Sequence, residues 1–129
     1  MTGDGFFSVD SLRGMWVLLI DDERSSRELL SDILEHCGAL VTAVGSAEGA
    51  LGVMRHVKPD ILVASLFHAQ RDARWLIKEV RALKPEEGGV IPAIIITSTE
   101  PGSGFEGHLI HPFDPWELCR LITNITNTA

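Results

Sequence analysis

Polar residues close several apolar runs of this sequence, and their types could form one charged pocket. Asp21 and Asp22 follow the run 16–20, and three further polar residues close later runs: Ser65, Thr97 and His111. Adjacent carboxylates are ligands that Mg²⁺ takes in proteins, and imidazole together with carboxylate can bind a transition metal. Such chemistry requires that the fold brings these residues together.

Apolar runs alternate with helical patterns along the chain. Runs rich in aliphatic residues predict strands over 16–20, 40–44, 61–64, 91–96 and 107–110. Between them, helical spacing predicts helices that begin at a capping box of Ser25 with Glu28, at Ser46, near Asp72 and at Asp114. The alternation predicts an α/β fold with a parallel sheet, whose strand ends gather the five polar residues into one site.

Composition restricts the class of partner and the compartment. The 129 residues suit one domain, which we expect over 15–129 after an N-terminal arm at 1–14, and the formal charge of −7 argues against nucleic acid and anionic membranes. The first apolar run, 15–20, is too short for a membrane span and lacks the basic flank of a signal peptide, which predicts a cytoplasmic protein. Cys37 and Cys119 fall on apolar helix stripes, which predicts two buried thiols rather than a disulfide.

Five stretches of the sequence, in this order, resemble the receiver domain of bacterial two-component response regulators, the CheY-like superfamily. They are VLLIDDE at 17–23, PDILV at 59–63, RALKPEEGG at 81–89, IPAIIIT at 91–97 and HPFDP at 111–115. The third and fourth look like receivers attached to hybrid sensor kinases. The resemblance implies a flavodoxin-like, three-layer, doubly wound fold with strand order 2-1-3-4-5.

Receiver chemistry requires an aspartate that accepts a phosphoryl group, acidic residues that hold Mg²⁺, a switch hydroxyl and a lysine. Matched by position, Asp21 and Asp22 are the acidic pair and Thr97 is the switch hydroxyl. Five other positions depart from the pattern: Ser65 replaces the acceptor, His111 the lysine, Leu109 the aromatic residue two positions earlier, and Ala69 and Ala73 the proline and glycine of the loop after the acceptor.

These departures predict a pseudo-receiver, which is an interaction module without catalytic residues or a required cofactor. A neutral Ser65 removes one negative charge from the pocket, so a lysine has less charge to balance and His111 suffices. Mg²⁺ could still bind weakly at Asp21 and Asp22. Another acceptor is not expected, because Asp60 lies at the other end of its strand, roughly 16 Å from Ser65 at about 3.3 Å per residue.

The connection between Thr97 and His111 is also shorter than in receivers and rich in proline, glycine and serine. We therefore predict that the fourth helix is missing or reduced to a turn, which leaves part of one sheet face uncovered. A partner such as a sensor kinase, another receiver or a second copy would then bind through apolar side chains, the candidates being Phe6, Phe7, Phe105, Leu109 and Trp116.

Two alternatives use the same pocket differently. The first is a non-standard phosphoacceptor that still employs Mg²⁺. The second is a metal- or ligand-sensing domain at Asp21, Asp22 and His111, with His68 as a further imidazole.

Overall fold

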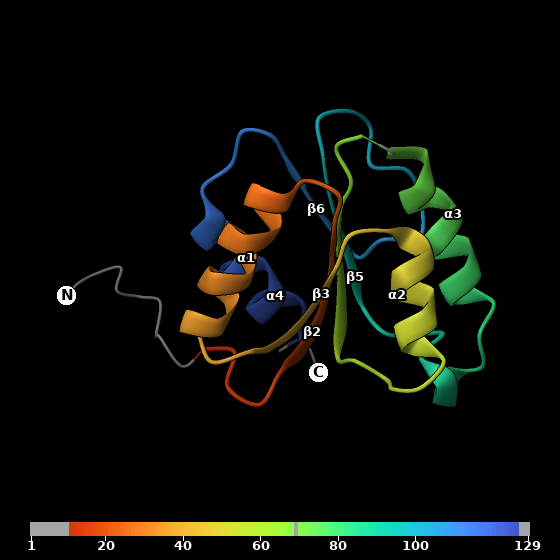
Figure 1. Ribbon diagram of the computed structural model, residues 1–129. Coiled ribbons are helices and arrows are strands. Elements are labelled where there is room, and N and C mark those ends of the chain that lie inside the picture. Colours follow the sequence, from red (N-terminus) through yellow and green to blue (C-terminus); the bar gives the residue numbers. More distant parts are fainter. Residues whose placement is uncertain (1–10, 69, 127–129) are drawn as a thin grey trace.

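The computed structural model describes residues 11–68 and 70–126. Its centre is a sheet of five parallel strands in the order β3-β2-β4-β5-β6 (Figure 1). The strands are β2 (Trp16–Asp21), β3 (Leu40–Val44), β4 (Ile61–Ser65), β5 (Ala93–Thr97) and β6 (Gly107–Ile110). Counted along the chain, this is the predicted order 2-1-3-4-5, so the flavodoxin-like fold is confirmed.

Two helices cover each face of the sheet. Helices α1 (Arg24–His36) and α4 (Pro115–Thr126) pack together on one face, and α2 (Ala47–Met54) and α3 (Gln70–Arg81) pack on the other (Figure 1). A short 3₁₀ helix, η1 (Pro85–Glu87), follows α3. The apolar side chains accordingly form two buried clusters, one under each helix pair.

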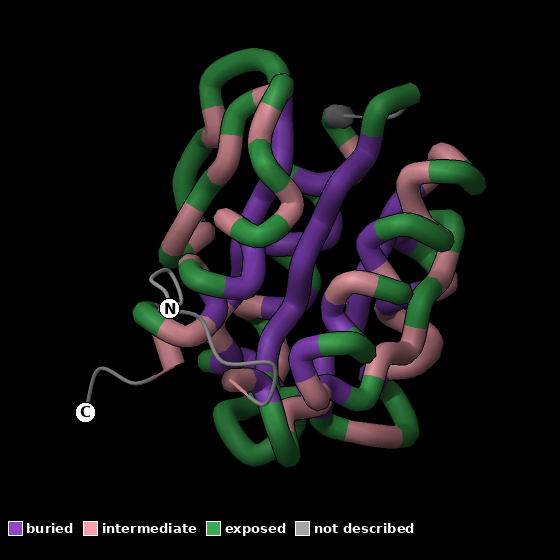
Figure 2. Tube along the Cα trace, turned by 90° about the vertical axis from the view of Figure 1, so that its left-hand side faces the viewer, coloured by how far each residue is buried: buried purple, intermediate pink, exposed green. Residues whose placement is uncertain are grey.

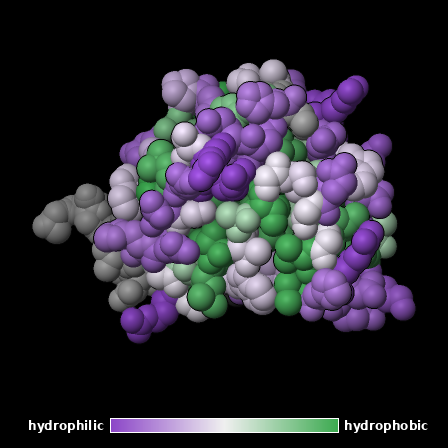
Figure 3. All heavy atoms as spheres, viewed as in Figure 1, coloured by the Kyte–Doolittle hydropathy of each residue, from purple (hydrophilic) through white to green (hydrophobic). Residues whose placement is uncertain are grey.

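The three central strands are buried on both faces, as expected for continuous apolar runs in a parallel sheet. Every residue of β4 and β5 is buried, and Figure 2 shows this buried path between the exposed outer segments. The edge strand β3 differs, because Leu40 is 67% exposed. Figure 3 shows the molecular surface in the view of Figure 1. On this surface, hydrophobic residues lie in the middle and more hydrophilic residues lie to either side.

The helix starts follow the predicted capping chemistry with one correction. Ser46 accepts from the Gly49 amide at the start of α2, and Asp114 exchanges hydrogen bonds with the first turn of α4, as predicted. The predicted box of Ser25 with Glu28 is wrong. Glu23 caps α1 instead, because its Oε1 accepts from the Ser26 amide at 2.6 Å.

The packed part of the chain begins earlier than the predicted boundary at residue 15. Leu12 is buried and its amide donates to the Cys37 carbonyl, so it anchors the chain to the end of α1. Phe6 and Phe7, which we expected to contact a partner, lie outside the described residues. Cys37 and Cys119 are both buried free thiols, as predicted, and burial raises the pKa of each.

The connection from β5 to β6 contains no helix, which confirms the predicted loss of the fourth one. The expected gap over the sheet is smaller than predicted, because Phe105 packs on the cluster that includes Ile95 and leaves Ile95 only 5% exposed. Exposure remains on β6, where His108 and Ile110 lie open to solvent.

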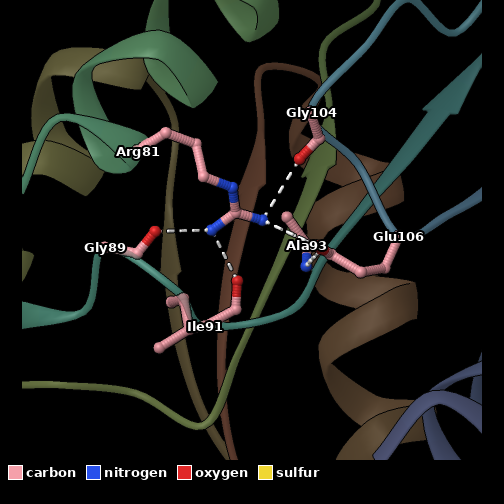
Figure 4. A network of polar contacts seen from close by, with 6 residues as sticks. All are labelled: Arg81, Gly89, Ile91, Ala93, Gly104 and Glu106. Carbon is pink, nitrogen blue, oxygen red and sulfur yellow. Dashed lines mark hydrogen bonds and ion pairs between the residues drawn. The ribbon is translucent and has the colours of Figure 1, made fainter. Parts of the chain in front are cut away.

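A single arginine holds this shortened connection in place (Figure 4). Nη1 of Arg81 donates to the carbonyls of Gly89 and Ile91, at 3.0 and 2.7 Å. Its Nη2 donates to the Gly104 carbonyl at 3.1 Å and to Glu106 Oε1 at 2.9 Å. Arg81 therefore joins the end of α3 to the segments that lead into β5 and into β6.

Candidate functional site

Parallel register brings the predicted polar residues to one edge of the sheet. Asp21 is paired with Ser65 across β2 and β4, and Thr97 ends the neighbouring strand β5. Among the described residues these three are the buried polar or charged ones, with exposures of 0%, 0% and 4%. The predicted gathering of strand ends is therefore confirmed for the centre of the site.

Each oxygen of the Asp21 carboxylate accepts a hydrogen bond from within the protein. Its Oδ1 accepts from the Glu23 amide at 2.9 Å, and its Oδ2 accepts from the Ser26 hydroxyl at 2.6 Å. Burial raises the pKa of Asp21, while these two hydrogen bonds lower it and the nearby charges of Asp22 and Glu23 raise it further. Loss of solvent is the largest of these effects.

The Asp22 carboxylate binds the loop that follows β4. Its Oδ1 accepts from the Phe67 amide at 2.7 Å and its Oδ2 accepts from the His68 amide at 2.8 Å. The sequence analysis missed these contacts. A signal existed, because the predicted strand order places the ends of β2 and β4 side by side, so the residues just beyond them must meet.

Ser65, which ends β4 and which the sequence matched to the phosphoacceptor position, has an unsatisfied side chain. Its hydroxyl is buried and forms no hydrogen bond with the described part of the protein. A buried hydroxyl without a partner costs free energy and is uncommon. Within residues 11–68 and 70–126, no imidazole or carboxylate accepts its proton in a hydrogen bond, so the geometry described gives Ser65 no activation as a nucleophile.

Thr97 and His111 complete the edge of the site. The Thr97 Oγ1 accepts from the Thr99 amide at 3.1 Å and contacts the Thr99 hydroxyl at 3.3 Å. The His111 ring lies between Phe67 and Phe113, at centroid distances of 4.6 and 5.3 Å. Burial lowers the pKa of His111, and the Asp21 charge opposes this effect, so the imidazole is held toward its neutral form.

The geometry does not bring together the three ligands of the alternative metal site at Asp21, Asp22 and His111. Within residues 11–68 and 70–126, no group of three or more histidine, cysteine, aspartate or glutamate side chains is placed to hold a metal ion. Asp60 lies at the opposite end of the sheet, where its carboxylate accepts from the Trp16 amide at 2.8 Å. It is therefore no substitute acceptor in this pocket.

The predicted partner-contact residues differ in exposure. Phe105 and Leu109 are half-buried and pack on the two core clusters, so they contribute mainly to the fold. Trp116 is 37% exposed and meets His36 edge-on at 5.9 Å. A groove of about 370 Å³ lies close by, between the start of α1 and the segment that leads into α4.

In the described chain, no helix has the length and apolarity needed to cross a membrane.

The sequence is similar to those of response regulators, although no protein-family model matches it. It is 34% identical over 122 residues to an uncharacterised 14.6 kDa protein in the sodA1 3′ region of Leptolyngbya boryana, covering 88% of this chain and 92% of that protein. It is 27% identical over 124 residues to the probable transcriptional regulator ycf27 of Guillardia theta, covering 88% and 47%. The chain thus spans about half the length of the named regulators that it matches.

Solved receivers share the fold. The receiver domain of the sensor histidine kinase PA1611 from Pseudomonas aeruginosa, with a magnesium ion in its active-site cleft, gives a TM-score of 0.75 at 23% identity over 86% of this chain and 96% of that one. The chemotaxis response regulator CheY4 of Vibrio cholerae gives 0.75 at 22% identity, over 86% and 98%. From its strand order, its strand-end pocket and these relatives, the chain belongs to the CheY-like receiver family of response regulators.

Proposed function

We propose that this receiver acts in two-component signalling as a pseudo-receiver, through protein contacts and without phosphorylation on aspartate. The observation that carries the proposal is Ser65, which ends β4 beside Asp21 where receivers present the acceptor carboxylate. An acyl phosphate forms only on a carboxylate. A serine hydroxyl would need a neighbouring base, and the Ser65 hydroxyl has no hydrogen-bond partner in the described chain.

The state of Asp22 supports a function that does not require Mg²⁺. Both of its oxygens accept from backbone amides of the β4–α3 loop, at 2.7 and 2.8 Å. A cation would have to compete with these two hydrogen bonds, and the third carboxylate of the receiver pattern is replaced by Ser65. We therefore propose that any Mg²⁺ binding is weak and has no role in the signal.

The surface next to the pocket is suited to a protein partner. The groove between α1 and the segment before α4 is lined partly by Leu29, Pro112 and Phe113. Leu29 is 53% exposed, and Phe67, which contacts His111 at the groove, is 38% exposed. Exposed apolar residues that gather at a groove are typical of protein-binding sites. The partner we propose is a sensor kinase, another receiver or a second copy of this chain.

Intact-mass spectrometry tests the phosphorylation claim. The protein is incubated with acetyl phosphate and Mg²⁺, beside a receiver that has aspartate at the acceptor position as a positive control for the reagent. We expect the control to gain one phosphoryl group and this protein to gain none. A phosphoryl adduct that hydroxylamine removes would identify an acyl phosphate and overturn the proposal.

A Mg²⁺ titration followed by amide chemical shifts tests the cofactor claim on the same protein. We expect no saturable change at the Phe67 and His68 amides at millimolar Mg²⁺. The D22N variant is the matched control, because it removes the charge and keeps one acceptor oxygen. Saturable changes that D22N abolishes would show a magnesium site and contradict this part of the proposal.

A further inference from the structure

A small polar hollow lies on the other side of Thr97, between α3 and the shortened β5–β6 connection. Its volume is about 230 Å³, enough for roughly seven water molecules at about 30 Å³ each. Six residues line it: Arg71, Arg74, Ile95, Thr97, Thr99 and Glu100. Its wall includes Thr99 and Glu100 of the connection, which forms no helix here. The lining is mostly polar, with two cations, two hydroxyls and one carboxylate.

The two arginines are placed on one side of the hollow. Arg71 and Arg74 are three residues apart on α3, so they lie on the same face of the helix. In the described structure neither guanidinium forms a hydrogen bond or an ion pair, although Glu100 lines the same hollow. Gly102, at φ +78, passes so close that a Cβ there would lie 3.4 Å from Arg74 Nε. The loop backbone therefore passes beside the Arg74 guanidinium.

The opposite wall adds hydroxyl groups. Thr97 and Thr99 have their Oγ1 atoms 3.3 Å apart, and both line the hollow. Guanidinium groups bind the oxygens of phosphate and carboxylate through paired N–H donors, and hydroxyls can add a further donor. This set of donors is suited to an oxyanion, in a chain whose formal charge of −7 otherwise repels anions.

Glu100 determines which oxyanion fits. A carboxylate repels an anion that has only acceptor atoms, but it accepts a hydrogen bond from an anion that carries its own O–H. At neutral pH inorganic phosphate retains a proton and sulfate does not. We propose that the hollow binds inorganic phosphate through Arg71, Arg74 and the threonine hydroxyls, and that Glu100 makes it prefer phosphate to sulfate.

Amide chemical shifts measured during titration with sodium phosphate, and separately with sodium sulfate at matched ionic strength, test the site. We expect saturable changes at Thr97, Thr99 and Arg74 with phosphate, and at least tenfold weaker binding of sulfate. R71A and R74A should each weaken phosphate binding at least tenfold. R55A is the matched control, since Arg55 is an exposed arginine at the end of α2, away from the hollow, and should leave the affinity unchanged.

Two further arms define the ligand and the role of Glu100. E100Q should bring the affinities for phosphate and sulfate within about threefold of each other. Phosphoserine distinguishes a free phosphate ion from a phosphate group on an organic molecule, because its monoester is mostly a dianion without an O–H at neutral pH and should bind more weakly than inorganic phosphate. The absence of saturable shifts with phosphate, tighter binding of phosphoserine than of phosphate, or an equal loss of affinity in R55A and R74A would overturn the proposal. Both arginines are exposed, so these variants should retain the fold.

Discussion

The strand-end pocket and the Arg81 network are two polar regions that differ in how completely their groups are paired. At Arg81, one guanidinium meets three backbone carbonyls and the Glu106 carboxylate, which itself accepts from the Ala93 amide at 2.7 Å. In the pocket, the Asp21 and Asp22 carboxylates are also fully paired, but the Ser65 hydroxyl has no partner in the described chain.

The two regions differ in whether each polar group meets a partner. The Arg81 network holds a connection that lacks a helix, and its donors match new acceptors in the loop. The pocket pairs the carboxylates of Asp21 and Asp22 but leaves the buried Ser65 hydroxyl without a partner among the described residues. A fully paired network stabilises a fold, whereas an unpaired buried group destabilises it. The two regions should therefore respond to mutation in opposite directions.

The largest effect is expected for R81A. It removes five hydrogen bonds, two of them to Glu106, so the free energy of unfolding should fall by about 3 kcal/mol, as measured by urea denaturation. Amide exchange over residues 98–106 should become faster, because Arg81 ties that connection to α3 through Gly104 and Glu106. R81K is the control, since it retains the charge but not the planar fork, and should fall between wild type and R81A. A loss below about 0.5 kcal/mol in R81A would mean that the network does not hold the loop.

A smaller effect of opposite sign is expected for S65A. Removing a buried hydroxyl that has no partner should raise the free energy of unfolding by about 1 kcal/mol, measured by the same urea titration. T97A is the comparison, because the Thr97 hydroxyl does accept a hydrogen bond, from the Thr99 amide, and its loss should destabilise the protein. If S65A were destabilising instead, the Ser65 hydroxyl would have a bonding role and the contrast between the two regions would fail.

Local patterns predicted most of the fold but not the pairing of polar groups. Strands β4 and β5 could be predicted because each is a continuous apolar run. The start of α4 could be predicted from the spacing of Asp114 and Glu117. Both signals are local, because each lies within a few consecutive residues. The cap of α1 was wrong because Ser25 with Glu28 has the spacing of a capping box. In the structure Ser26 donates its hydroxyl to Asp21 and its amide to Glu23, so the helix starts earlier.

Long-range contacts had no local signal at all. Arg81 meets Gly104 and Glu106 across more than twenty residues, and no spacing rule relates them. The residues of the strand-end pocket could be predicted because parallel strand ends converge in any sheet of this order. What each of them bonds to could not, since that depends on backbone positions in loops such as the one after β4.

The smallest expected effect is the pH dependence of D21N, and it tests whether the carboxylates of the pocket resemble Arg81 or Ser65. Burial raises the pKa of Asp21 in the folded protein, so the folded state favours the protonated form. The stability that comes from this preference is complete below the unfolded pKa of 3.8 and is lost as the pH rises through the folded pKa. Asparagine carries no charge and keeps an acceptor for the Glu23 amide. D21N should therefore be more stable than wild type at pH 7, and the difference should shrink as the pH falls toward 4.

His111 has the opposite pH dependence, at higher pH. Its lowered pKa means that the folded protein favours the neutral ring. The stability from this preference is complete above the unfolded pKa of 6.5 and is lost as the pH falls through the folded pKa. Because wild type and D21N both contain His111, comparing their unfolding midpoints at each pH largely removes its contribution. A D21N protein that is less stable than wild type at pH 7 would show that the hydrogen bonds from Ser26 and Glu23 outweigh the burial of the charge. The pocket would then be a paired network of the same kind as the one around Arg81, with Ser65 as its single exception among the described residues.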